Sequence, residues 1–83
     1  MYFVYILKSV GRKRFYIGAS SDVSKRLAEH NRGCAKSTKP YRPWQLVYTE
    51  KFKSKTSAYK REFHLKHPRG YLDKIKIIES LKI

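Results

Sequence analysis

Short apolar runs separated by polar, turn-forming segments predict a small fold of strands and helices. Residues 2–8, 15–18 and 44–52 are rich in β-branched and aromatic side chains, which is typical of strands. The polar segment 9–14 contains Gly11, so the first two strands are expected to form a hairpin. The alternation of side chains along a strand places Phe3, Tyr5 and Leu7 on one face of the sheet.

Polar capping residues and helix-breaking residues mark two further elements. A helix is expected to follow a cap at Ser21 or Asp22, to run to about residue 31 and to end at Gly33. A second helix is expected to begin at Ser54 or Thr56 and to stop at residues 68–70, which include a proline and a glycine.

The remaining segments complete the predicted topology. Residues 34–43 contain two prolines and no periodicity, which indicates a loop, and residues 71–82 predict a third helix. The order β-β-α-β-α-α predicts an α+β fold, with a small, mainly antiparallel three-stranded sheet and helices packed over it. The length of 83 residues indicates one domain, residues 1–83.

Charge indicates the class of partner. Twenty Lys and Arg residues against six Asp and Glu residues give a net charge of +14. Repulsion among these charges destabilises a compact fold unless a polyanion is close, and nucleic acid is the commonest such partner. An anionic membrane is the weaker alternative, because no segment pairs a basic face with a strongly apolar one.

The cysteine count and the apolar runs favour a cytoplasmic protein. Cys34 is the one cysteine, so no internal disulfide is possible, which suits a reducing compartment. No apolar run approaches the roughly 20 residues that span a bilayer, and the N-terminus lacks the layout of a secretory signal.

Arg26 and His30 are candidate functional residues in the first helix. At about 100° per residue, they lie one turn apart and border the apolar stripe of Val23 and Leu27. They are therefore expected at the seam between helix and sheet. The alternative is that they only flank the edge of the core, with Arg26 extending to water.

Glu62 occupies an unusual position in the second helix. It lies about 40° from Ala58 on a helical projection, inside an apolar arc that also includes Leu65, Tyr59 and Phe63. A carboxylate there costs free energy unless it is paired. An arginine or a metal ion would pair it at a functional site, and a lysine or arginine of the sheet or first helix would pair it structurally. Three polar residues are expected on the opposite face, Lys60, Arg61 and His64.

Two tyrosines of the hairpin complete the candidate set. Tyr5 lies in the first strand, and Tyr16 shares one face of the second strand with Gly18. A strand tyrosine is usually a core residue. Gly18, however, is expected to leave space beside Tyr16 for a ligand.

Taken together, these residues resemble the GIY-YIG nuclease superfamily, and in particular its small stand-alone members. Its two motifs align with Phe3-Val4-Tyr5 and Tyr16-Ile17-Gly18. Arg26 matches the arginine of the first helix, His30 matches a histidine that some members carry one turn later, and Glu62 matches the metal-binding glutamate.

The resemblance extends from residue 2 to about residue 65, with two departures. Phe3 replaces the glycine of the first motif, and Ala19 stands where some members have a lysine. If that lysine stabilises charge, another basic residue must do so in this chain.

The resemblance implies a metal-dependent endonuclease that hydrolyses phosphodiester bonds of DNA, on branched, nicked or otherwise distorted structures. Glu62 would bind Mg²⁺ or Mn²⁺, and Arg26 would hold the non-bridging phosphate oxygens. Tyr5 or Tyr16 would orient the water or relay its proton, once the metal or Arg26 lowers the phenol pKa. His30 would assist proton transfer or bind a phosphate. The alternative is a non-catalytic DNA- or RNA-binding protein that keeps the nuclease fold.

Two basic segments are candidate nucleic-acid contacts. They comprise Arg12, Lys13 and Arg14 in the hairpin turn, and Lys36, Lys39 and Arg42 in the long loop. The alternative is a basic surface that is merely solvated. Cys34 with His30, or His64 with His67, provides no four-ligand zinc spacing, so a zinc site is not expected.

Overall fold

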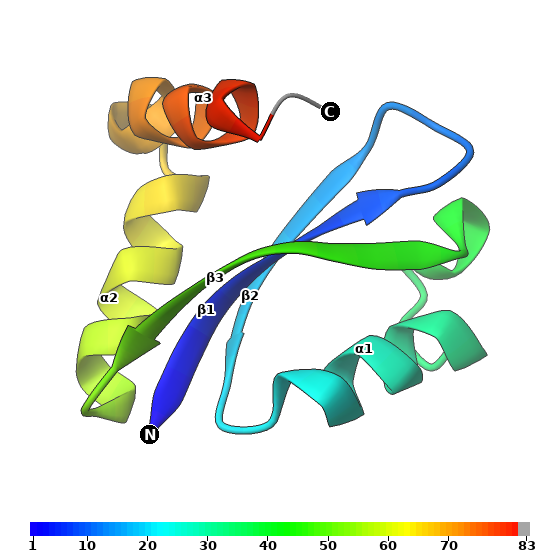
Figure 1. Cartoon of the computed structure of the whole chain (residues 1–83), viewed down its shortest axis with the longest axis horizontal. Coiled ribbons are helices and arrows are strands. Elements are labelled where there is room, and N and C mark those ends of the chain that lie inside the picture. Colours follow the sequence, from blue (N-terminus) through cyan, green and yellow to red (C-terminus); the bar gives the residue numbers. More distant parts are fainter. Residues whose placement is uncertain (82–83) are drawn as a thin grey trace.

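The fold is a three-stranded antiparallel sheet with three helices, as a computed structural model of residues 1–81 shows (Figure 1). The strand order is β2-β1-β3, with β1 (Tyr2–Ser9) between β2 (Phe15–Ser20) and β3 (Trp44–Phe52). The predicted α+β class and the order β-β-α-β-α-α are confirmed. Within residues 1–81, none of the helices combines the length and the apolar character that crossing a bilayer requires.

Capping side chains begin the first two helices. The Asp22 carboxylate accepts the Lys25 N–H at 3.0 Å at the start of α1 (Val23–Arg32), and Gly33, with a φ of +82°, ends the helix. The Ser54 hydroxyl accepts the Ser57 N–H at 3.2 Å at the start of α2 (Lys55–Lys66). These ends agree with the capping signals of the sequence.

The chain after α2 turns sharply through Gly70. A 3₁₀ helix, Pro68–Gly70, joins α2 to α3 (Tyr71–Ser80). A side chain at residue 70 would overlap the His64 carbonyl group, so only glycine fits. The predicted third helix extended to Lys82, which lies outside the described residues. The segment predicted as a loop contains a further 3₁₀ helix, Lys39–Tyr41.

The helices cover opposite faces of the sheet (Figure 1). Val23 and Leu27 of α1 pack on the face that carries Tyr5 and Leu7. Ala58 and Leu65 of α2, with Ile77 of α3, pack on the face that carries Val4 and Ile6. A site that uses residues of both α1 and α2 must therefore form at an edge of the sheet.

The buried side of α2 differs from the prediction. Ala58 and Leu65 are buried, but Tyr59 is 42% exposed and Phe63 is 69% exposed, so the expected apolar arc was too wide. Arg61, expected on the outer face, is half-buried.

The physical reason is an ion pair between α2 and β3. The Arg61 guanidinium donates to both carboxylate oxygens of Glu50, at 2.9 and 3.1 Å. The Tyr48 hydroxyl donates to the same carboxylate at 2.6 Å. Burial raises the pKa of Glu50, but the hydrogen bonds from Arg61 and Tyr48 lower it by more. The pKa of Glu50 therefore lies below its ordinary value. This pair turns the helix toward Arg61 and turns Tyr59 and Phe63 outward.

Candidate active site

The Tyr5 side chain crosses the neighbouring strand over Gly18. The two residues are register partners on β1 and β2, and Tyr5 is 1% exposed. A Cβ atom at residue 18 would lie 2.5 Å from the Tyr5 hydroxyl oxygen and 2.6 Å from the ring carbon that bears it. The expectation that Gly18 leaves room for a ligand was therefore wrong, since the Tyr5 phenol fills that space. Its hydroxyl is brought to β2, the edge strand.

At this edge the Tyr5 hydroxyl meets Arg26 of α1. The two groups are close enough for the guanidinium to lower the pKa of the phenol and for the phenol to raise the pKa of Arg26. Burial raises the pKa of Tyr5, and the nearby Arg26 guanidinium offsets only part of the rise, so the pKa stays above its ordinary value of 10.0. The expected activation of this phenol by Arg26 is therefore outweighed by burial. Tyr5 is a neutral phenol that can orient a ligand but is a poor base.

Arg26 has a second partner, which the sequence reasoning missed. Its Nη1 donates to Glu29 Oε1 at 2.8 Å, and the Arg26 side chain is 43% exposed. The sequence did contain a signal for this pair, because side chains three positions apart on one helix, such as Arg26 and Glu29, are neighbours.

The His30 side chain is fully buried. The sequence analysis expected it at the seam between helix and sheet. Its Nδ1 lies 2.9 Å from Thr38 Oγ1, and the Thr38 hydroxyl donates to the Ala35 carbonyl oxygen at 3.4 Å. With the Thr38 hydroxyl assigned to Ala35, Nδ1–H donates to Thr38, and in this tautomer the lone pair lies on Nε2. Nε2 is buried and has no hydrogen-bond partner within residues 1–81.

The surroundings keep the His30 imidazole neutral. Burial lowers its pKa below the ordinary value of 6.5, and the positive charge of Arg26 lowers it further. The Tyr16 ring lies over it, with 4.5 Å between the two ring centroids. His30 thus presents an unoccupied proton acceptor beside Tyr16.

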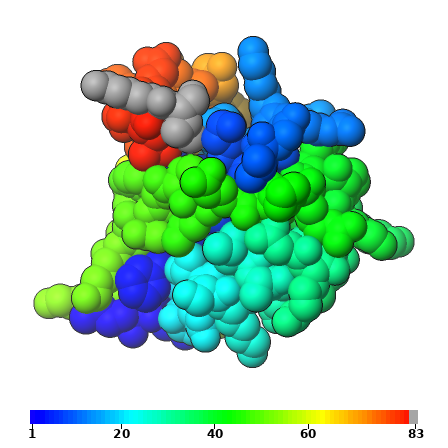
Figure 2. Space-filling view, turned by 45° about the vertical axis from the view of Figure 1, so that its right-hand side comes forward, coloured from blue at the N-terminus to red at the C-terminus, as the bar shows by residue number. Residues whose placement is uncertain are grey.

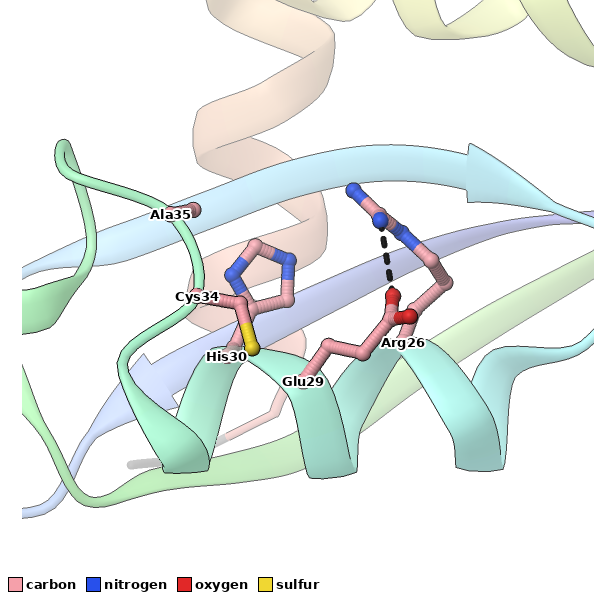
Figure 3. A pocket seen from close by; sticks show the side chains of 5 residues that line it. All are labelled: Arg26, Glu29, His30, Cys34 and Ala35. Carbon is pink, nitrogen blue, oxygen red and sulfur yellow. Dashed lines mark hydrogen bonds and ion pairs between the residues drawn. The ribbon is translucent and has the colours of Figure 1, made fainter.

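A small cavity opens beside Arg26 and His30 (Figure 3). Its volume is about 150 Å³, and its lining consists of Arg26, Glu29, His30, Cys34 and Ala35. Figure 3 shows the Arg26 and His30 side chains projecting from α1 toward the sheet, with Arg26 joined to Glu29. The cavity is large enough for several water molecules. Tyr5, Tyr16 and Glu62 lie outside its lining.

Glu62 approaches the same edge from α2. Its carboxylate raises the pKa of Tyr5, which places the two groups within electrostatic reach. Lys66 Nζ donates to Glu62 Oε2 at 2.7 Å and lies 5.3 Å from the centroid of the Tyr16 ring. The partner of Glu62 is thus a lysine of its own helix, not one of the sheet or the first helix. Lys66 was also missed, although its spacing of four residues from Glu62 was the available signal.

The five candidate residues form one connected set. Tyr5 contacts Arg26 and, with 6.3 Å between ring centroids, Tyr16. Tyr16 contacts His30, and Lys66 joins Tyr16 to Glu62.

The donor set limits the metal that can bind. Within residues 1–81 there is no group of three or more His, Cys, Asp or Glu side chains that could hold an ion. Glu62 alone fits a hard cation such as Mg²⁺, which takes one or two carboxylates and completes its shell with water and phosphate oxygens. The Glu62 side chain is 18% exposed, so an ion can reach it, in competition with Lys66.

Residues 1–74 match the family model described as the GIY-YIG catalytic domain. The chain belongs to the GIY-YIG family. A UPF0213 protein of Staphylococcus saprophyticus is 44% identical over 66 residues, and one of Staphylococcus aureus is 46% identical over 66 residues. Each match covers 78% of this chain and 79% of the relative. The solution NMR structure of a UPF0213 protein from Bacillus halodurans is 32% identical, with a TM-score of 0.52, and covers 93% of this chain and 85% of that one.

In this GIY-YIG domain, a lysine from another element lies near the position where the motif lacks one. Ala19 replaces the lysine that some members carry after the second motif. Lys66 brings an ammonium group to the same strand from α2, over the Tyr16 ring.

The predicted basic segments lie side by side at the end of the GIY-YIG sheet where β1 ends and β3 begins. The Val10 N–H donates to the Pro43 carbonyl oxygen at 3.0 Å, and Arg12 and Arg14 lie 5.7 and 4.8 Å from the centroid of the Tyr41 ring. Figure 2 shows the hairpin turn in blue above the green segment that follows the loop. All six basic side chains of the two segments are exposed, Arg12, Lys13, Arg14, Lys36, Lys39 and Arg42.

Gly18→Ala tests the passage of Tyr5 over β2. The added methyl group meets a buried phenol that cannot move freely, so we expect a loss of about 1–3 kcal/mol in the free energy of unfolding. Gly11→Ala is the matched control, because nothing lies within 4 Å of the added atom, and it should be near neutral. Urea denaturation measures both variants. Equal stability of the two would contradict the packing described.

Proposed function

We propose that this chain is a metal-dependent endonuclease that hydrolyses phosphodiester bonds in branched, nicked or otherwise distorted DNA. The observation that carries the proposal is the meeting of Arg26, His30 Nε2 and Glu62 around two tyrosines at one open edge of the sheet. A GIY-YIG domain is a nuclease-type fold, and GIY-YIG nucleases act on DNA.

Arg26 would bind the phosphate that is to be cleaved. The planar guanidinium matches the non-bridging oxygens, and its bond to Glu29 is the kind of partly exposed pair that is worth only about 0.2–1 kcal/mol. A phosphate can therefore replace Glu29 at little cost. The exposed basic residues of the hairpin turn and loop would bind phosphates further along the backbone.

His30 would act as the general base. In the assigned tautomer its Nε2 holds a lone pair, the imidazole is neutral, and a cavity that can hold water adjoins the His30 side chain. The attacking water would transfer its proton to Nε2 as its oxygen bonds to phosphorus and the bond to the leaving oxygen breaks. Tyr5 and Tyr16 would orient this water and the phosphate, since the Tyr5 phenol remains protonated.

Glu62 would hold Mg²⁺ or Mn²⁺. When bound, the ion supplies charge stabilisation at the phosphate and at the leaving oxygen. Lys66, released from Glu62 by the ion, would remain beside Tyr16 as an additional cation for the phosphate.

A non-catalytic DNA- or RNA-binding protein is the second candidate. It is favoured by the internal pairing of Arg26 with Glu29 and of Glu62 with Lys66, which leaves both groups neutralised without a ligand. Nuclease assays with Mg²⁺ and Mn²⁺ on duplex, nicked, flapped and branched DNA distinguish the two candidates.

Glu62→Ala should lower metal-dependent cleavage by at least about 100-fold, because it removes the ligand for the ion. DNA affinity should stay the same or rise, since a negative charge is lost. Glu79→Ala is the control, because it removes an exposed carboxylate from α3 with the same change in net charge. Cleavage by Glu62→Ala at the wild-type rate would contradict the assignment of Glu62 as the metal ligand.

The pH profile of cleavage tests His30. A base must be neutral, and the pKa of His30 is lowered, so kcat/KM should be constant near pH 7 and fall only below pH 6.5. His30→Gln should lower turnover by about 10²–10⁴-fold and remove this acid limb. The control His64→Gln changes an exposed histidine that is paired with Asp73 and should keep the wild-type profile. An unchanged profile in His30→Gln would rule out His30 as the base.

A further inference from the structure

The outer side of α2 carries two aromatic side chains that the fold does not bury. Tyr59 and Phe63 lie one turn apart and are 42% and 69% exposed. The core contacts of this helix are made by Ala58 and Leu65. Figure 1 shows α2 in yellow-green on the outside of the sheet, with no other element over its outer side.

The surroundings of the two rings are basic. A groove of about 450 Å³ follows this side of α2, and its lining consists of Lys55, Thr56, Tyr59, Lys60 and Phe63. Lys55 Nζ lies 5.6 Å from the centroid of the Tyr59 ring. Cations beside exposed rings are the combination that binds single-stranded nucleic acid, because the cations bind phosphates while the rings stack on bases.

The groove also adjoins the proposed site. Glu62 precedes Phe63 on α2, and successive helical positions are separated by about 100°. Glu62 and Lys66 therefore occupy the side of α2 next to Tyr16, and Tyr59 and Phe63 occupy the adjacent side. A strand held at Glu62 through a bound cation would therefore have these rings on the adjacent side of the helix.

We propose that Tyr59 and Phe63 form a stacking platform for unpaired bases, with Lys55 and Lys60 bound to the flanking phosphates. A base within an intact duplex is already stacked on its neighbours and cannot use the platform. The platform would thus select DNA with unpaired nucleotides near the bond to be cleaved. This role in cleavage rests on the proposed function, whereas the binding of unpaired bases does not.

Phe63→Leu tests the platform, because leucine keeps an apolar side chain and removes the aromatic face. Affinity for a fluorescently labelled single strand, measured in EDTA, should fall by about 5- to 100-fold, as the loss of one stacked base predicts. Affinity for the same sequence as a fully paired duplex should change less than twofold. Phe63→Trp should retain single-strand affinity, and its fluorescence should be quenched on binding.

Tyr71→Leu is the matched control. Tyr71 is a 55% exposed aromatic residue on α3, and Lys74 Nζ lies 5.4 Å from its ring centroid, an arrangement like that of Lys55 and Tyr59. This variant should bind both DNAs as the wild type does. Because Phe63 is exposed, the variants should melt at the wild-type temperature, which circular dichroism checks.

Equal affinity of Phe63→Leu and wild type for the single strand would overturn the platform. If Phe63→Leu also shifts the protein from dimer to monomer in sedimentation, this side of α2 is a protein interface instead. A wild-type protein that cleaves no DNA but shows the single-strand effect would end the proposed function and leave the platform intact.

Discussion

The passage of the Tyr5 side chain over Gly18 is the contact on which the candidate site depends. Helices α1 and α2 cover opposite faces of the sheet, so their polar residues would ordinarily be separated by the sheet itself. With glycine at this position of the edge strand, the phenol extends across β2 and brings its hydroxyl to Arg26 from one side and near Glu62 from the other. A strand with a larger side chain at residue 18 would hold these groups apart.

The charged groups of the candidate site are paired within single helices, and under the proposed function a substrate would replace these partners. Arg26 with Glu29 and Lys66 with Glu62 are both short pairs within one helix, and the two cations are 43% and 46% exposed. Pairs of this kind contribute about 0.2–1 kcal/mol each to stability. A phosphate bound to the cation, or a divalent ion bound to the carboxylate, would offset the loss of such a pair. The buried His30 is different, because its neutral form and its bond to Thr38 are fixed by the fold before any ligand arrives.

The sequence predicted those features that depend on local chemistry. The strands followed from their apolar runs, and the beginnings of α1 and α2 followed from Asp22 and Ser54, because capping requires only neighbours in the chain. The outward rotation of α2 could not be predicted, since it depends on the distant pair of Arg61 and Glu50.

The same distinction holds for the site. Spacing and resemblance predicted the five candidate residues, Tyr5, Tyr16, Arg26, His30 and Glu62. Thr38 as the partner of His30 was not predicted, because it lies in the loop that follows α1, whose path the periodicity does not define. The burial of the Tyr5 hydroxyl, which raises its pKa, likewise depends on packing across strands.

Binding of Mn²⁺, followed by NMR on the ¹⁵N-labelled protein, tests the central claim most directly. A paramagnetic ion broadens the amide signals nearest to it, so the account predicts that signals of Glu62 and Lys66 weaken first, together with those of Tyr5 and Gly18 across the edge of the sheet. Signals of the hairpin turn, residues 10–14, should weaken less. Broadening centred on the exposed pair of His64 and Asp73, or none around Glu62 at millimolar Mn²⁺, would contradict the account.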